Sequence, residues 1–141
     1  MHRIARATLT AFAPYSQSRI HEIPKLPKEG ADAYEQRTWR EKCHATESGE
    51  ICIPQMSFKQ SVDSAAKYLS ISVPGKGKAT YTKNFTSGCL VLEPVNLGIS
   101  KDDVAMDRIY ANANGIRGSG KRVWRLFPRI DKWKADVEFH V

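Results

Sequence analysis

One segment has the length and periodicity of a stable amphipathic helix, residues 55–69. Its apolar residues recur at helical spacing along one face, at positions Phe58, Val62, Ala65, Ala66 and Leu69. Pro54 stands just before it, where a missing N–H costs nothing, and Pro74-Gly75 stops further helix. The other apolar segments follow strand periodicity, so we predict an α+β fold with one principal helix on an antiparallel sheet.

Strands are predicted where apolar and polar residues alternate or where a short apolar run is bounded by turn residues. Ile4–Phe12 and Ala135–Val141 alternate clearly, so each has one buried face. The run Cys89-Leu90-Val91-Leu92 predicts a buried strand over Gly88–Leu97. Val123–Phe127 is a further strand, and Met106–Ala111 is a weaker one.

The remaining segments are less regular. Residues 13–37 carry Pro14, Pro24, Pro27 and Gly30, which predict a long loop or arm, and Pro74–Phe85 is a glycine- and lysine-rich connection. Two structures compete beyond the loop. Thr38–Ala45 with Ile51–Pro54 suggests a hairpin, while Asp32–Cys43 is rich in helix formers. We expect residues 1–141 to form a single domain.

Several classes of protein are disfavoured. No apolar run is long enough to cross a bilayer, and no signal-peptide pattern follows the basic N-terminus, so a cytoplasmic location is expected. Three cysteines make an odd count that does not suit a disulfide framework, so reduced thiols are expected. Cys43, His44, Cys52 and Cys89 offer zinc-ligand chemistry at an unusual spacing, and we expect neither a metal nor a cofactor.

The sequence does not predict a catalytic site. Gly115–Lys121 has the G-x₄-G-K spacing of a phosphate loop, but Arg122 replaces the magnesium-binding Ser or Thr. The following residues are strand-like, so no helix N-terminus is expected to face a phosphate. The four histidines are scattered, and none accompanies a nucleophile and an orienting carboxylate. We interpret the glycine-rich segment as a hairpin tip that can contact anions.

Positive charge is concentrated in one segment. Residues 108–134 carry eight Lys and Arg against the single acid Asp131, an excess equal to the net charge of +7. Trp124, Phe127 and Trp133 are interleaved with these cations. Such a surface can neutralise phosphates and stack on unpaired bases, although aromatic residues in strands also fill cores. The predicted binding residues are Arg19, Lys59, Lys76, Lys78, Tyr81, Lys83, Arg117, Lys121, Arg122 and Arg125.

Residues 53–66, IPQMSFKQSVDSAA, resemble the start of the first helix in RAMP proteins, the RNA-binding modules of CRISPR effector complexes. The same stretch is similar to one in a family of phage proteins, with close counterparts of residues 14–19, 34–44, 74–85 and 118–123. Gln55 stands where RAMP proteins usually have glycine, and Asp63 or Ser64 where a basic residue is common. The resemblance implies a ferredoxin-like or RRM-like fold that is shortened at its C-terminus.

Three functions from different classes follow. The first is non-enzymatic binding of single-stranded nucleic acid, RNA above all, by a protein of phage or mobile-element type. The second is inhibition of host defence, in which an anti-CRISPR protein docks on an effector complex by resembling its backbone subunit. The third is an enzyme whose site forms only in three dimensions. No membrane partner is expected, and an open sheet edge would allow self-association.

Overall fold

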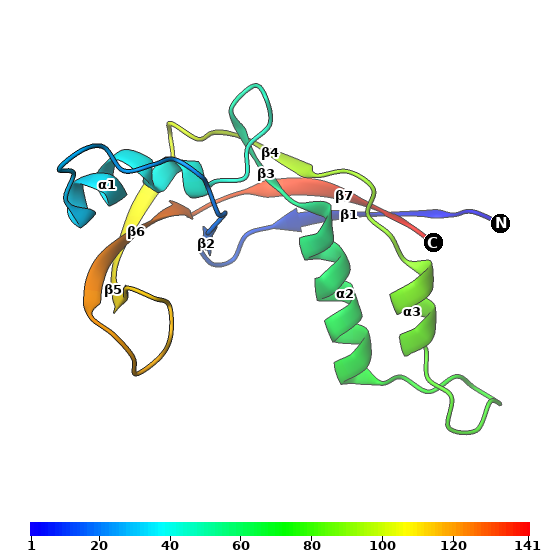
Figure 1. The fold of residues 1–141 in the computed structure, drawn as a ribbon. Helices are drawn as coiled ribbons and strands as arrows, with labels where there is room; N and C mark the ends of the chain where they lie inside the picture. The colour runs from blue at the N-terminus through cyan, green and yellow to red at the C-terminus, as the bar shows by residue number, and fades with distance from the viewer. The chain divides into compact units, whose positions relative to one another are not determined.

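The computed structural model describes residues 1–141. In it, helix α2 (Gln55–Leu69) spans the same residues that sequence periodicity predicts. The fold is α+β (Figure 1). The chain forms two compact units, and the segments of the two units alternate along the sequence. Unit 1 comprises Met1–Thr10, Cys52–Leu97 and Lys134–Val141, and unit 2 comprises Ala11–Ile51 and Gly98–Trp133. The sequence led us to expect one domain. No helix is long and apolar enough to span a membrane.

Unit 1 contains the first and last strands, which pair with each other. β1 (Ile4–Thr10) and β7 (Lys134–His140) are antiparallel, with Ile4 opposite His140 and Thr10 opposite Lys134. Both strands were predicted from their alternation. Ala135 and Val137 of β7 are buried, while the residues between them face outward. On its other edge, β7 is bridged to Leu90 by two backbone hydrogen bonds with His140.

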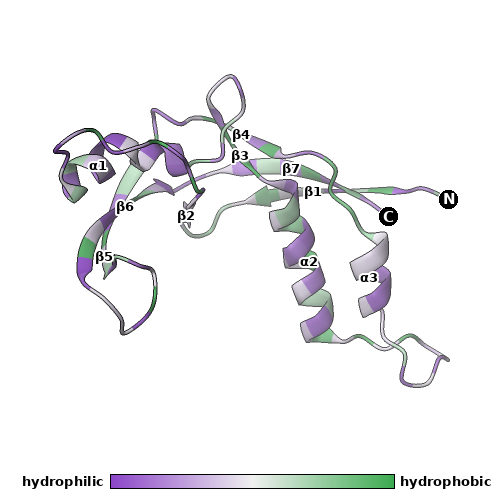
Figure 2. Cartoon of the chain, in the orientation of Figure 1, coloured by the Kyte–Doolittle hydropathy of each residue, from purple (hydrophilic) through white to green (hydrophobic).

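Unit 1 also contains two helices. Helix α2 carries bands of hydrophobic and hydrophilic residues (Figure 2), as expected for an amphipathic helix. It ends at Ser70, whose left-handed φ of 44° stops the helix. Helix α3 (Thr82–Gly88) packs against α2, and the Thr82 hydroxyl donates to the Ala66 carbonyl. Apart from Lys83 the segment has only weak helix formers, which is why the sequence did not predict α3.

Unit 2 is organised around a β-hairpin. β5 (Ala105–Asn112) pairs antiparallel with β6 (Arg122–Ile130), and β2 (Tyr15–Ser16) pairs with the far end of β6. Helix α1 (Ala31–Thr38) and the 3₁₀ turn η1 (Trp39–Lys42) lie against β6 (Figure 1). Buried residues of this unit include Trp39, Cys43, Leu126 and Ile130.

β3 (Glu50–Ile53) and β4 (Val95–Ser100) form a separate two-stranded sheet. The strand expected over Gly88–Leu97 was therefore placed too early. Cys89–Leu92 is extended, with Cys89 and Val91 buried, but Leu90 and Leu92 are half exposed. A segment that buries only one face can be extended without pairing along both of its edges. A short apolar run in the sequence does not show whether one face or both are buried.

The irregular segments also differ in part from expectation. The predicted loop 13–37 contains β2, and its last residues belong to α1, so the helical alternative over Asp32–Cys43 is correct. The competing hairpin is reduced to one bridge between Ala45 and Ile51 around the turn at residues 46–49. Within 74–85, residues from Thr82 onward are helical.

Candidate nucleic-acid interface

The β5–β6 hairpin brings two aromatic side chains together on an exposed face. The strand register places Tyr110 directly opposite Trp124. Their ring centroids are 5.0 Å apart and their planes are inclined by 47°. Tyr110 is 45% exposed and Trp124 is 41% exposed. Both rings therefore keep surface available to a ligand while touching each other.

The hydrogen-bonding pattern explains why these rings meet. Leu126 directs its backbone N–H to Glu35 and its carbonyl to the Lys42 ammonium, both away from β5. The pair Arg108–Leu126 is therefore non-hydrogen-bonded. Pairs alternate along an antiparallel ladder, so Tyr110–Trp124, two residues further, is also non-hydrogen-bonded. Side chains approach most closely in pairs of this kind.

Arginines extend the aromatic pair into a continuous row. The Arg108 guanidinium carbon lies 4.2 Å from the centroid of the Trp124 ring, and that of Arg122 lies 4.8 Å from the Tyr110 ring. Arg122 also donates to the Tyr110 carbonyl at 2.8 Å. We call Arg108, Trp124, Tyr110 and Arg122 the stacked row. All four are exposed, so the row presents cations at its ends and rings between them.

The loop of the hairpin adds positive charge beside the row. Arg117 and Lys121 are exposed, and the side chains of Asn112 and Asn114 bond within the loop. Gly120 has a φ of 74°, and a Cβ there would meet the Asn114 amide at 3.2 Å. The segment that resembles a phosphate loop is thus a strand-to-strand connection, because β6 begins at Arg122 and no helix follows. The expected hairpin tip is confirmed.

A surface pocket of about 470 Å³ adjoins the row. One wall is the start of α1, from Gly30 to Ala33, including the Asp32 carboxyl. The other wall is formed by Tyr110 and the beginning of β6, residues 121–124. The side chains of Asp32 and Lys121 form no hydrogen bond or ion pair within the chain, so both remain available to a ligand.

Arg125, a predicted contact residue, is engaged within the protein. It donates to the Glu35 carboxylate at 2.9 Å, and Glu35 also accepts from Lys42 at 2.7 Å. Burial opposes ionisation of Glu35, but the Leu126 N–H, Lys42 and Arg125 together outweigh it, so the pKa of Glu35 is lowered. This network holds α1 and η1 against β6, the strand that carries Trp124 and Arg122.

The predicted residues of unit 1 lie around α2 and α3. Lys76 and Lys78 are exposed in the connecting turn, Lys83 is exposed on α3, and Tyr81 precedes that helix. Tyr81 lines an apolar groove of about 190 Å³ with seven other residues, Val62, Ala65, Ala66, Leu69, Ile71, Thr82 and Phe85. The lining of this groove is apolar, which differs from the aromatic and cationic row of unit 2.

Lys59 and Arg19, the two remaining predicted residues, differ in exposure. Lys59 is only 8% exposed, and its ammonium contacts the Asp63 carboxylate and the carbonyls of Phe85 and Thr86. This engagement removes Lys59 from the exposed surface, and helical periodicity alone did not show it. Arg19 is exposed and lines a separate pocket with Glu22 and Glu41.

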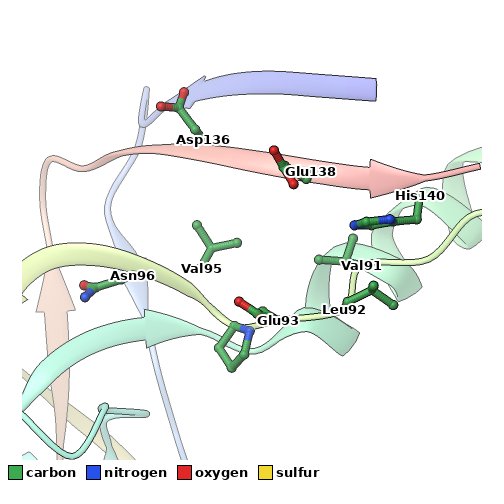
Figure 3. Close-up of a pocket in the computed structure, with 9 residues that line it drawn as sticks. Val91, Leu92, Glu93, Val95, Asn96, Asp136, Glu138 and His140 are labelled. Carbon is green, nitrogen blue, oxygen red and sulfur yellow. The ribbon is translucent and has the colours of Figure 1, made fainter. Parts of the chain in front are cut away.

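A pocket of about 590 Å³ lies along the exposed face of β7 in unit 1 (Figure 3). Asp136, Glu138 and His140 project from β7, and Glu93 comes from the opposing segment. Asp136 accepts from Thr8, Glu138 pairs with Arg6, and His140 bonds to His2 at 2.9 Å. Three carboxylates in its lining make this pocket unfavourable for a polyanion.

The thiols are buried and separate. Burial raises the pKa of Cys43 to about 11 and also raises that of Cys52 and Cys89. No group of three or more His, Cys, Asp or Glu side chains is placed to hold a metal ion. The structure therefore does not bring together the four residues with zinc-ligand chemistry.

Sequence reasoning missed the centre of the site. Tyr110 was not considered, and Arg108 and Trp124 were noted only as part of a basic segment. The available signal was the alternation R-x-Y-x-N before the glycine-rich turn and R-x-W-x-L after it. Folding these two strands onto each other at Asn112–Arg122 places the aromatics opposite one another. Comparison of the chain with protein-family models, curated proteins and solved structures gave no match.

Proposed function

We propose that the protein binds single-stranded nucleic acid, with RNA the favoured ligand, through the stacked row and the adjoining hairpin loop. The observation that carries this proposal is the exposed Arg108–Trp124–Tyr110–Arg122 row. Binding is non-enzymatic, because the ligand is held by stacking and charge alone.

The chemistry favours an unpaired strand over a duplex. Aromatic faces and guanidinium planes can stack on bases only when those bases are not already stacked in a helix. Arg117, Lys121 and Arg122 lie along the same hairpin, where they can neutralise successive phosphates. The acid-lined pocket of β7 offers neither interaction.

We also propose a ferredoxin-like arrangement and a phage or mobile-element origin. Antiparallel pairing of the first and last strands, with α2 inserted between them in sequence, supports a ferredoxin-like arrangement for unit 1. The phage or mobile-element context rests on the resemblance of residues 53–66 to RAMP proteins and phage proteins. The proposal of nucleic-acid binding depends on neither the fold name nor the phage setting, since it rests on the hairpin of unit 2 alone.

Fluorescence anisotropy with a labelled single-stranded RNA of mixed sequence tests the function. The double variant Tyr110→Ala/Trp124→Ala should bind at least about fivefold more weakly, because stacking contributes roughly 1–3 kcal/mol per base. Phe12→Ala is the matched control, since Phe12 is a fully exposed aromatic in the same unit with no stacked cation. A labelled duplex of the same sequence should bind more weakly than the single strand.

Two results would overturn the proposal. The first is equal affinity of the double variant and the parent chain while Phe12→Ala behaves as the parent. The second is absence of RNA binding at low salt, where the electrostatic contribution is largest. Circular dichroism of each variant establishes that the hairpin substitutions leave the fold intact.

The groove between α2 and α3 favours a second function, docking on a protein. Leu69, Ile71 and Phe85 line it while remaining substantially exposed. An inhibitor that joins a CRISPR effector complex would need such a surface. Leu69→Glu/Ile71→Glu should then abolish binding to a purified effector complex in biolayer interferometry, while Tyr110→Ala/Trp124→Ala retains it. Loss with the hairpin variant alone would reject docking at this groove.

A further inference from the structure

The pocket beside the stacked row contains an acidic group that a general phosphate-binding surface does not need. Asp32 lines it together with Tyr110, Trp124, Lys121 and Arg122. The Asp32 carboxylate has no partner in the chain. A carboxylate repels phosphates, so Asp32 suits a contact with hydrogen-bond donors of a ligand rather than with its phosphates.

The geometry provides both a platform and polar groups for one base. The rings of Tyr110 and Trp124 offer exposed surface against which a planar ligand can stack. The first turn of α1 has no side-chain cap, so the backbone N–H groups of residues 31–33 at the same pocket remain free to donate. The pocket thus presents an acceptor-only carboxylate next to backbone donors.

These groups match one base better than the others. On its Watson–Crick edge, guanine carries the O6 acceptor next to the N1–H and N2–H₂ donors. Backbone N–H groups suit O6, and the two oxygens of Asp32 suit the adjacent donors. Cytosine and adenine offer the carboxylate one amino group beside an acceptor. Uracil offers a single N–H between two carbonyls that would face the carboxylate unfavourably.

We propose that this pocket receives one unpaired base of the bound strand and selects guanine, with Asp32 accepting from N1–H and N2–H₂. Tyr110 and Trp124 supply the stacking surface, and Lys121 and Arg122 hold the flanking phosphates. This inference rests on the proposed single-strand binding and names the base that the site prefers.

Anisotropy with a series of short oligouridylates tests the preference, each carrying one central base: guanine, adenine, cytosine or uracil. The guanine strand should bind on the order of tenfold more tightly than the uracil strand. Inosine, which lacks only the N2 amino group, should give an intermediate affinity. 7-Deazaguanine, whose Watson–Crick edge is unchanged, should bind like guanine.

The variant Asp32→Asn should lose the preference for guanine. Asp103→Asn is the matched control, because Asp103 is exposed in the same unit outside the pocket and the change of net charge is identical. Asp103→Asn should bind all strands slightly more tightly through reduced repulsion and keep the guanine preference. Asp32→Asn should bind the guanine strand more weakly than the parent chain does, so that its affinity falls to that of the other strands.

Failure of this inference is distinguishable from failure of the proposed function. Equal binding of all strands by the parent chain, or a guanine preference that survives in Asp32→Asn, would reject base selection while single-strand binding stands. No measurable binding of any strand would reject both. The base series on the unchanged protein decides the question even if Asp32→Asn folds poorly.

Discussion

At the scale of single residues, Glu35 is the most consequential polar group. Its buried carboxylate forms ion pairs with Lys42 and Arg125. It also accepts a hydrogen bond from the Leu126 backbone N–H, as a neighbouring strand would do. Glu35→Gln should lower the free energy of unfolding at pH 7 by about 3 kcal/mol, because it leaves a buried ammonium without a counter-charge. Urea unfolding followed by circular dichroism measures the change.

The pH dependence has a defined sign. The pKa of Glu35 is lowered in the folded state, so ionised Glu35 stabilises the fold above its ordinary value of 4.5, and this contribution is lost at lower pH. Glu35→Gln should therefore flatten the loss of stability on acidification. The hydrogen bond with Arg37 lowers the pKa of Glu29 to about 2, so some acid sensitivity remains. Exposed Glu47→Gln, the control, should leave the parent profile unchanged.

The cysteines allow a second prediction at this scale. All three thiols are buried, and the pKa of Cys43 is about 11. Thiolate is the reactive form, so Ellman's reagent at pH 8 should modify less than one thiol per folded chain within minutes and all three in denaturant. Rapid modification of the native protein would contradict the burial of these side chains.

At the scale of elements, one side chain of α2, Lys59, contributes two of the hydrogen bonds that hold α3. The Lys59 ammonium contacts the carbonyls of Phe85 and Thr86 near the end of α3, and it pairs with Asp63. Lys59→Met should cost about 3 kcal/mol, since Asp63 loses its partner and the carbonyls lose their donor. Hydrogen exchange should show faster exchange throughout Thr82–Gly88.

Lys67→Met is the matched control on the same helix, because Lys67 is exposed and its ammonium forms no hydrogen bond or ion pair with α3. It should leave exchange in α3 unchanged. RNA affinity distinguishes the structural role from the predicted binding role: both variants should bind RNA alike. A selective loss of affinity in Lys59→Met without altered exchange would restore Lys59 to the interface.

At the scale of the whole molecule, the chain carries a net charge of +7, and the proposed nucleic-acid binding should weaken with salt according to the number of phosphates that its cations neutralise. Arg117→Ala/Lys121→Ala/Arg122→Ala should reduce the log–log slope of affinity against salt by about 0.7 for each phosphate that is no longer neutralised. The comparison variant is Lys76→Ala/Lys78→Ala/Lys83→Ala, which removes the same charge from unit 1. If the hairpin is the interface, the second variant changes the slope less.

Equal slopes for the two triple variants would show that binding follows net charge rather than the hairpin. A larger effect of the unit 1 variant would move the interface to the surface around α2 and α3. Titration by anisotropy at several salt concentrations gives both slopes with the same labelled RNA.

Local periodicity determined the elements whose residues carry their own pattern. α2, β1 and β7 were predicted with bounds within two residues, because one face of each is apolar and the spacing of that face identifies the element. α3 and the position of β4 were not predicted. Thr82–Gly88 is a weak helix former that is held by Lys59 and Ala66, and no local rule includes such partners.

The candidate interface could be assembled only from the tertiary structure, for the same reason. Composition identified a basic segment with interleaved aromatics, and the glycine-rich turn marked a hairpin. The pairing that closes at Asn112–Arg122 places Tyr110 against Trp124, and the Leu126 N–H that points away from β5 is accepted by Glu35, a residue 91 positions away. Sequence by itself determined which residue types were available. Only the tertiary structure decided which of them share a face, because strand pairing and buried ion pairs join segments that are distant along the chain.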